Sequence, residues 1–151
     1  MKQVVVVGTG IMAVGIAAGF LATSHQVILL GRTQSRAKEQ EVEILALTKT
    51  MNPDWEASGA KLVTGEIASW ADWSEVIWVI ETIKEDMQLK QELFASLDQR
   101  VPEHIPIGSN SSGFPISKIV LGLKYLIILK NNRALFELFF KKKYVICFLI
   151  I

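Results

Sequence analysis

The sequence predicts an α/β protein built on an open, doubly wound parallel sheet, and three observations lead to this prediction. Val4–Gly8 (VVVVG) is an apolar run without polar alternation, which is typical of a strand covered on both faces. A helical pattern of small residues follows at 11–23, and a second apolar strand at 26–30 completes a β-α-β unit. Apolar strand segments and helical segments then continue to alternate, as expected for a parallel sheet with helices on its faces.

The remaining elements follow in order along the chain. Further strands are expected at 61–65, 76–80 and 105–109. Further helices are expected at 33–50, 85–100 and 115–121, and the expected cap of the first of these three is Thr33 or Ser35. In the first helix the spacing predicts one buried face made of Ile11, Val14, Ala18 and Leu21. In the helix at 85–100 the predicted buried stripe is Leu89, Leu93 and Leu97, with Lys90 off it.

Composition narrows the class of protein. A chain of 151 residues is long enough for about one domain with a real core, and its net charge of +1 gives no indication of a nucleic-acid partner. The single cysteine, Cys147, excludes an internal disulfide framework and a cysteine-based zinc site. We therefore expect no metal, no nucleic acid and a reducing, cytoplasmic location.

A membrane or secretory segment is the alternative reading of the N-terminus. The stretch 3–31 carries no Asp, Glu, Lys or Arg, and Gly15 and Gly19 have the spacing that lets membrane helices pack closely. However, Gly8-Thr9-Gly10 would interrupt a spanning helix, and a run of four valines favours a strand. We therefore expect no membrane association.

The composition changes abruptly after residue 123. Of the 28 residues 124–151, 23 are Lys, Tyr, Leu, Ile, Phe or Asn, a composition that resembles AT-rich DNA read out of frame. The final apolar run is too short to span a bilayer. We therefore expect a domain at 1–123 followed by an atypical tail from a truncated or frameshifted product.

A glycine turn follows the first strand, in the pattern that binds the pyrophosphate of a dinucleotide. Gly8 permits the tight turn, Gly10 leaves room for the phosphates, and Ala13 is small enough for helix-strand packing. With Thr9 in the turn, the helix beginning at Ile11 and Met12 would offer unpaired N–H groups to the phosphates. A glycine turn without a nucleotide is the plainer alternative, and the strand-turn-helix context favours the dinucleotide.

The end of the second strand indicates the type of dinucleotide. NAD sites of this kind carry Asp or Glu there, to accept hydrogen bonds from the ribose hydroxyls. This chain has Gly31, followed by Arg32 and Thr33, with Arg36 one turn later. Arginine can bind a 2′-phosphate, so NADP is favoured over NAD; the alternative is that both arginines are solvated charges at a helix start.

Three segments together resemble the NAD-binding domain of the 3-hydroxyacyl-CoA dehydrogenases. The first resembles that family's G-x-G-x-M-G-x-G-I-A, the second its strand ending in Glu-Ala-x-x-Glu with a following Lys-x-x-Leu-Phe helix, and the third its Asn-Thr-Ser-Ser. The matching segments are GTGIMAVGIA, VIETIKEDMQLKQELFASLD and GSNSSGFPISKI. The resemblance covers residues 1 to about 123 and implies a Rossmann-like domain whose full-length relatives form homodimers.

The resemblance also implies roles for individual residues. Glu85 and Lys90 would lie by the nicotinamide half of the cofactor, and Asn110 and Ser112 near the nicotinamide and the substrate oxygen. In this reading Ser112 and Asn110 are the candidate catalytic residues, because a serine hydroxyl there can hold the 3-hydroxyl or ketone. The plainer alternatives are an acidic helix start for Glu85 and a local Asn-Ser-Ser-Gly turn.

The chain also departs from the family's pattern. The resemblance places a histidine base after Gly122-Leu123, where this chain has Lys124, and the family's helical C-terminal domain is missing. The section 32–61 is shorter than the family's, which puts the acyl-CoA substrate in doubt. We therefore expect the cofactor half of a 3-hydroxyacyl-CoA dehydrogenase-like oxidoreductase that does not turn over alone. A non-catalytic NADP-binding sensor or partner subunit is the alternative, and a membrane protein using the lysine-rich tail is a third hypothesis.

Overall fold

The computed structural model describes residues 1–121, 123 and 144–146. The chain divides into two compact units, Met1–Lys84 and a second that begins at Glu85. The rest of the atypical tail, 124–143 and 147–151, lies outside the described residues. No helix among those that the structure describes is long and apolar enough to cross a membrane.

Four parallel strands form the sheet of the first unit. They are β1 (Gln3–Val7), β2 (Gln26–Gly31), β3 (Leu62–Glu66) and β4 (Val76–Glu81), in the spatial order β3-β2-β1-β4. The chain starts at β1, winds outward to β3 and then returns to β4 on the other side of β1. This reversal confirms the predicted doubly wound parallel fold, and in such folds ligands bind where the winding direction changes, here between β1 and β4.

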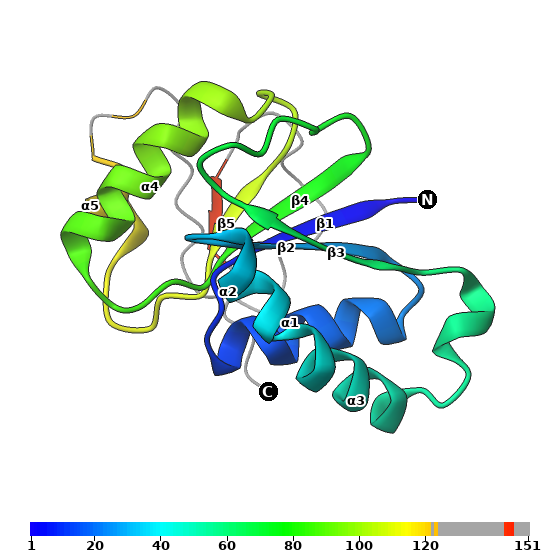
Figure 1. The fold of residues 1–151 in the computed structure, drawn as a ribbon. Coiled ribbons are helices and arrows are strands. Elements are labelled where there is room, and N and C mark those ends of the chain that lie inside the picture. The colour runs from blue at the N-terminus through cyan, green and yellow to red at the C-terminus, as the bar shows by residue number, and fades with distance from the viewer. Residues whose placement is uncertain (122, 124–143, 147–151) are drawn as a thin grey trace, which may run out of the picture. The chain divides into compact units, whose positions relative to one another are not determined.

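The longest helix of the first unit lies against one face of this sheet, and a second long helix packs beside it. The helices of the unit are α1 (Ile11–Ala22), α2 (Gln34–Glu39) and α3 (Glu41–Met51), followed by one 3₁₀ turn at Trp55–Ser58. Figure 1 shows α1 and α3 running side by side along the sheet. Ala13, Ala17 and Ala18 are fully buried in α1, and such small side chains let the helix lie close to the strands. Ile11 does not join this face as predicted, since it is 88% exposed at the start of the helix.

The single helix expected at 33–50 is wrong, because the chain forms two helices that meet at Gln40. Thr33 caps α2, its hydroxyl accepting from the Arg36 N–H, which confirms one of the two predicted caps. The Gln40 N–H bonds to the Ala37 carbonyl three residues earlier, so the first helix tightens as it ends. The break allows the two helices to contact different neighbours. Helix α2 packs toward β2 and β3, whereas α3 packs on α1.

Ser24 ends the α1–β2 turn in a left-handed conformation, with φ = 67°, that side chains with a Cβ adopt at a cost. It is exposed, and its N–H bonds to the Leu21 carbonyl, as in a glycine helix stop. We expect Ser24→Gly to raise the free energy of unfolding by about 0.5–1 kcal/mol, measured by urea denaturation. The same change at Ser35, inside α2, is the control and should lower stability by a similar amount. A loss of stability in Ser24→Gly would contradict the prediction.

The connection between β3 and β4 contains a turn that is held by the side chain of Asp72. The Asp72 carboxylate accepts hydrogen bonds from the Ser74 hydroxyl at 2.7 Å and from the Ser74 N–H at 3.2 Å. These two bonds favour the charged form, so they lower the pKa of Asp72 below its ordinary value of 3.8. A lowered pKa means that the turn is stabilised above the ordinary value and loses this stabilisation as the pH falls through the lowered one.

We expect Ser74→Ala to raise the pKa of Asp72 toward its ordinary value, because the larger of the two contributions is removed. An NMR titration of the Asp72 carboxyl carbon checks this. Ser69→Ala, an exposed serine in the same connection, serves as the control and should leave the titration unchanged. An unshifted Asp72 in Ser74→Ala would show that the hydroxyl contributes nothing.

The second unit contains α4 (Met87–Arg100), β5 (Ile107–Ser109), α5 (Ile116–Ile119) and β6 (Tyr144–Ile146). Asp86 caps α4 by accepting from the Leu89 N–H, and β5 pairs in parallel with β6, a strand that begins within the tail. The predicted buried stripe of α4 is only partly correct, because Leu97 is fully buried but Leu89 and Leu93 are half-buried. Lys90, Phe94 and Leu97 are its fully buried side chains, and Lys90, expected off the stripe, is 0% exposed.

Candidate dinucleotide-binding site

The turn after β1 requires glycine at its first position. Gly8 has φ = +133°, and a Cβ added to it would lie 2.4 Å from the Thr82 hydroxyl oxygen, well inside van der Waals contact. Its N–H bonds to the Leu30 carbonyl of β2 at 2.9 Å, while the preceding Val7 carbonyl accepts from the Thr82 N–H at 2.8 Å. The turn is therefore held on both sides by the neighbouring strands.

Gly10 differs from Gly8, because nothing in its surroundings excludes a side chain and the fold itself does not require glycine there. It is the N-cap of α1, and a Cβ added there meets no atom within 4 Å. The N–H groups of the first helical turn, which includes Ile11 and Met12, have no partners within the helix. Both side chains are exposed, at 88% and 38%. Open space in front of unpaired N–H groups at a helix N-terminus fits a pyrophosphate.

The end of β2 is closely packed and carries no carboxylate. Gly31 is buried, and a Cβ there would lie 2.8 Å from the Thr33 carbonyl oxygen and 3.0 Å from the Ala37 nitrogen. The methyl group of Thr9 lies 3.1 Å from the same point, so the glycine turn after β1 and the end of β2 are in contact. An acidic side chain at this position would require the β2–α2 turn to move.

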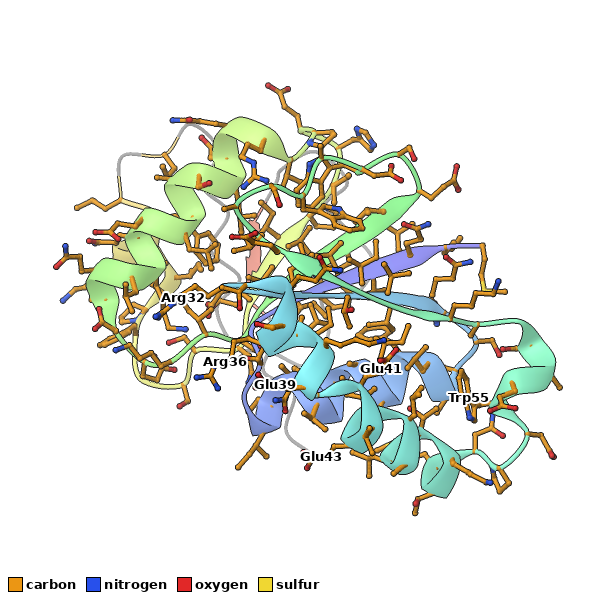
Figure 2. All side chains as sticks on the ribbon, in the orientation of Figure 1. Arg32, Arg36, Glu39, Glu41, Glu43 and Trp55 are labelled. Atoms are coloured by element: carbon orange, nitrogen blue, oxygen red, sulfur yellow. The ribbon has the colours of Figure 1, made fainter. Side chains whose placement is uncertain are left out.

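Two arginines follow Gly31 at the surface. Arg32 is exposed between β2 and α2, and Arg36 lies within α2, where it pairs with Glu39 at 3.4 Å (Figure 2). An exposed pair of this kind contributes little to stability, so Arg36 can exchange Glu39 for another anion at small cost. The Thr33 hydroxyl is occupied as the helix cap and also lies 3.0 Å from the Ser35 hydroxyl.

In the second unit, Glu85 organises the loop that follows β5. Its carboxylate accepts from the Ser111 hydroxyl at 2.9 Å and from the Ser112 N–H at 3.1 Å. The Ser111 oxygen in turn accepts from the Phe114 N–H at 3.1 Å. The structure thus brings together Glu85 and Ser112, two residues that the family resemblance places in one site, and adds Ser111, which no sequence pattern singles out.

Ser111 and Ser112 differ sharply in exposure. Ser111 is 4% exposed and holds the loop from inside, whereas the Ser112 side chain is exposed and Asn110 is half-buried. A hollow of about 240 Å³ lies against this loop. Its lining residues are Ser109, Ser111, Ser112, Gly113, Phe114, Pro115, Ile116 and Ile119. Nothing in the sequence distinguishes Ser111 from Ser112, because the difference is set by which one points at Glu85.

No group of three His, Cys, Asp or Glu side chains that could hold a metal ion occurs among the residues that the structure describes. A parallel sheet, a glycine turn at its carboxyl edge and an open helix N-terminus define a dinucleotide-binding domain of the Rossmann type. Residues 3–125 match the family model described as "3-hydroxyacyl-CoA dehydrogenase, NAD binding domain". The chain therefore belongs to this family, as its sequence motifs predict.

Similar proteins agree with this assignment. The mitochondrial hydroxyacyl-coenzyme A dehydrogenase of Rattus norvegicus is 32% identical over 130 residues, covering 79% of this chain and 41% of the relative. The (S)-3-hydroxybutyryl-CoA dehydrogenase of Ralstonia eutropha has a TM-score of 0.66 at 23% identity, covering 79% of this chain and 44% of that one. The Escherichia coli 3-hydroxybutyryl-CoA dehydrogenase gives 0.61 at 25% identity, covering 82% and 27%. The chain thus spans less than half the length of these relatives.

Proposed function

We propose that this domain binds NADP(H) in preference to NAD(H), as the cofactor half of an oxidoreductase acting on 3-hydroxyacyl substrates. The observation that carries the cofactor preference is the crowded Gly31. In an NAD site, the residue at this position is an acidic one that accepts hydrogen bonds from the ribose hydroxyls. In this chain the position has no room for a carboxylate. Arg32 and Arg36 follow it, and guanidinium groups bind phosphate through paired, charge-assisted hydrogen bonds.

Different residues would bind different parts of the cofactor. Gly8, Thr9 and Gly10, with the first turn of α1 at Ile11 and Met12, would hold the pyrophosphate, and Arg32 with Thr33 the adenosine ribose and its phosphate. When bound, the nicotinamide would accept hydride from C3 of the hydroxyacyl substrate.

The second unit would serve the nicotinamide and the substrate. Ser112, exposed on its loop, would hold the substrate oxygen with Asn110, and Glu85 would hold that loop in place. Lys90, buried on α4, would support the nicotinamide half of the site. An acyl-CoA as the substrate, the absence of nucleic-acid and membrane partners, and a cytoplasmic location are parts of the same proposal.

Titration with NADPH and NADH tests the cofactor preference. Nucleotide fluorescence on binding should show tighter binding of NADPH. The double variant Arg32→Ala with Arg36→Ala should lose at least about tenfold in NADPH affinity, because losing even one charge-assisted hydrogen bond costs about 1.5–3 kcal/mol. Lys38→Ala is the matched control. It also removes a cation from α2, one that pairs with Glu41. Equal affinities for the two cofactors would contradict the proposal.

The chain by itself is proposed to bind cofactor without turning over, because Lys124 stands where the family resemblance places a histidine base. This also favours the second candidate function, an NADP-binding subunit without catalysis of its own. Absorbance at the reduced nicotinamide band, with acetoacetyl-CoA as the substrate, should show no NADPH oxidation above background. Turnover in this assay would show that another group acts as the base.

A further inference from the structure

Thr82 is a residue in which this chain departs from its family's pattern at the edge of the dinucleotide site. The second family segment has Ala after the first glutamate, and this chain has Glu81-Thr82. Thr82 follows β4 directly, and its side chain is half-buried. The chain therefore places a hydroxyl, on a half-buried side chain, where the family pattern places a methyl group.

The hydroxyl is not needed to form the glycine turn. The Thr82 N–H already bonds to the Val7 carbonyl at 2.8 Å, and alanine would keep that bond. The hydroxyl adds a second donor to the same carbonyl at 3.0 Å. A carbonyl with two donors is fully satisfied, so the turn gains only a modest extra stabilisation from the side chain.

The position of Thr82 places its oxygen at the mouth of the ligand crevice. Val7 and Glu81 are paired in register across β1 and β4, so Gly8 and Thr82 are the next residues at the carboxyl edge of these strands. The winding of the sheet reverses between these two strands, which is where such folds bind their ligands. The hydroxyl oxygen lies 2.4 Å from the point where a Cβ on Gly8 would stand, directly over the turn.

The hydrogen bond that the Thr82 hydroxyl already makes determines whether a ligand group can donate to it or accept from it. Its proton is donated to the Val7 carbonyl, so only acceptor lone pairs remain for a ligand. The ligand group must therefore be a donor, such as a ribose hydroxyl. Arg32 and Gly31 lie at the end of β2, on one side of β1, and Thr82 lies on the other side. A dinucleotide whose adenosine ribose lies at β2 extends its nicotinamide half toward β4.

We propose that Thr82 is a cofactor-binding residue whose hydroxyl oxygen accepts a hydrogen bond from a ribose hydroxyl in the nicotinamide half of the dinucleotide. The proposal rests on the proposed function, since it requires that the chain bind a dinucleotide. It adds one contact to the site, made by a side chain that the family's alanine cannot provide.

Comparing a whole dinucleotide with its adenosine fragment tests this contact. Thr82→Val keeps the shape of the side chain and removes the hydroxyl, and Thr82→Ser keeps the hydroxyl. The ligands are whichever of NADPH and NADH binds more tightly and the matching fragment, 2′,5′-ADP or ADP. Calorimetry should show about a fivefold loss of dinucleotide affinity in Thr82→Val and an unchanged fragment affinity, the size expected for one neutral hydrogen bond. Thr82→Ser should bind within about twofold of the unsubstituted protein.

Two further variants keep the test decisive. Thr50→Val is the matched control, because the exposed Thr50 hydroxyl also donates to a backbone carbonyl, that of Ala46 at 3.1 Å, but lies on α3. Thr82→Ala, the family's own residue, should bind like Thr82→Val, and it replaces that variant if a thermal melt shows valine to be misfolded.

Three results would overturn the role of Thr82. They are unchanged dinucleotide affinity in the valine and alanine variants, an equal loss for the fragment, and a loss in Thr82→Ser as large as in Thr82→Val. If the unsubstituted protein binds neither dinucleotide, the proposed function itself fails.

Discussion

Gly10→Val is expected to weaken dinucleotide binding at least about tenfold while leaving the domain folded. Nothing lies within 4 Å of a Cβ at Gly10, so the fold has room for the new side chain. The same room is where a pyrophosphate must approach the first-turn N–H groups of α1. Losing one charge-assisted hydrogen bond costs about 1.5–3 kcal/mol, so affinity should fall at least about tenfold and by more if several bonds are lost. A fluorescence titration measures this loss.

Gly8→Val is the matched comparison, because it places the same side chain two residues earlier with the opposite expected outcome. Gly8 has φ = +133°, and its Cβ would stand 2.4 Å from the Thr82 oxygen and 3.0 Å from the Thr82 backbone. Strain and overpacking together should lower the free energy of unfolding by about 3 kcal/mol or more, measured by urea denaturation. For Gly10→Val the corresponding loss should stay below about 1 kcal/mol. Unchanged cofactor affinity in Gly10→Val would contradict the proposed path of the pyrophosphate.

The strands could be predicted from the sequence because each is a short apolar run with a clear boundary. β1, β2 and β4 lie within one residue of their expected ends, since buried parallel strands need nothing beyond continuous apolar character. The break at Gln40 could not be predicted, because no glycine or proline marks it. It arises from tertiary packing, which gives α2 and α3 different neighbours.

The sequence predicts where helices occur better than it predicts which of their residues are buried. Ile11 fits the periodicity of α1 but lies in its first turn, beyond the edge of the packed core, and so remains exposed. Lys90 is polar, so the pattern predicts it off the buried stripe, yet it is fully buried on α4. Hydrophobic periodicity cannot identify a buried lysine, since it counts the residue as polar, and a lysine is fully buried only where its charge is compensated.

The site shows the same division between local and distant information. The expected roles of Gly8 and Gly10 depend only on their spacing next to a strand, which is local information; Gly8 has a positive φ against Thr82, and Gly10 faces open space. Thr82 and Ser111 act through residues that are 75 and 26 positions away in the sequence. A contact over such a separation exists only once the sheet and the loops have formed, so no local pattern contains it.

Gly31→Asp, which restores the acidic residue of an NAD site, is expected to fail as a change of cofactor. The new Cβ would stand 2.8 Å from the Thr33 carbonyl oxygen and 3.0 Å from the Ala37 nitrogen, both backbone atoms that cannot rotate away. Overpacking of this kind should cost about 1–3 kcal/mol of stability and displace the start of α2.

The affinities of Gly31→Asp for NADPH and NADH distinguish the effect of packing from the effect of charge. A carboxylate beside Arg32 would repel a 2′-phosphate, so NADPH affinity should fall about tenfold or more. NADH affinity should not rise in return, because the displaced turn no longer presents the carboxylate to the ribose hydroxyls. Gly31→Ala is the control: it should show most of the loss of stability and less of the loss of NADPH affinity. Tight NADH binding by Gly31→Asp, measured by the same titration, would mean that the turn can open at little cost. The cofactor preference would then follow from the missing carboxylate alone, without the close packing around Gly31.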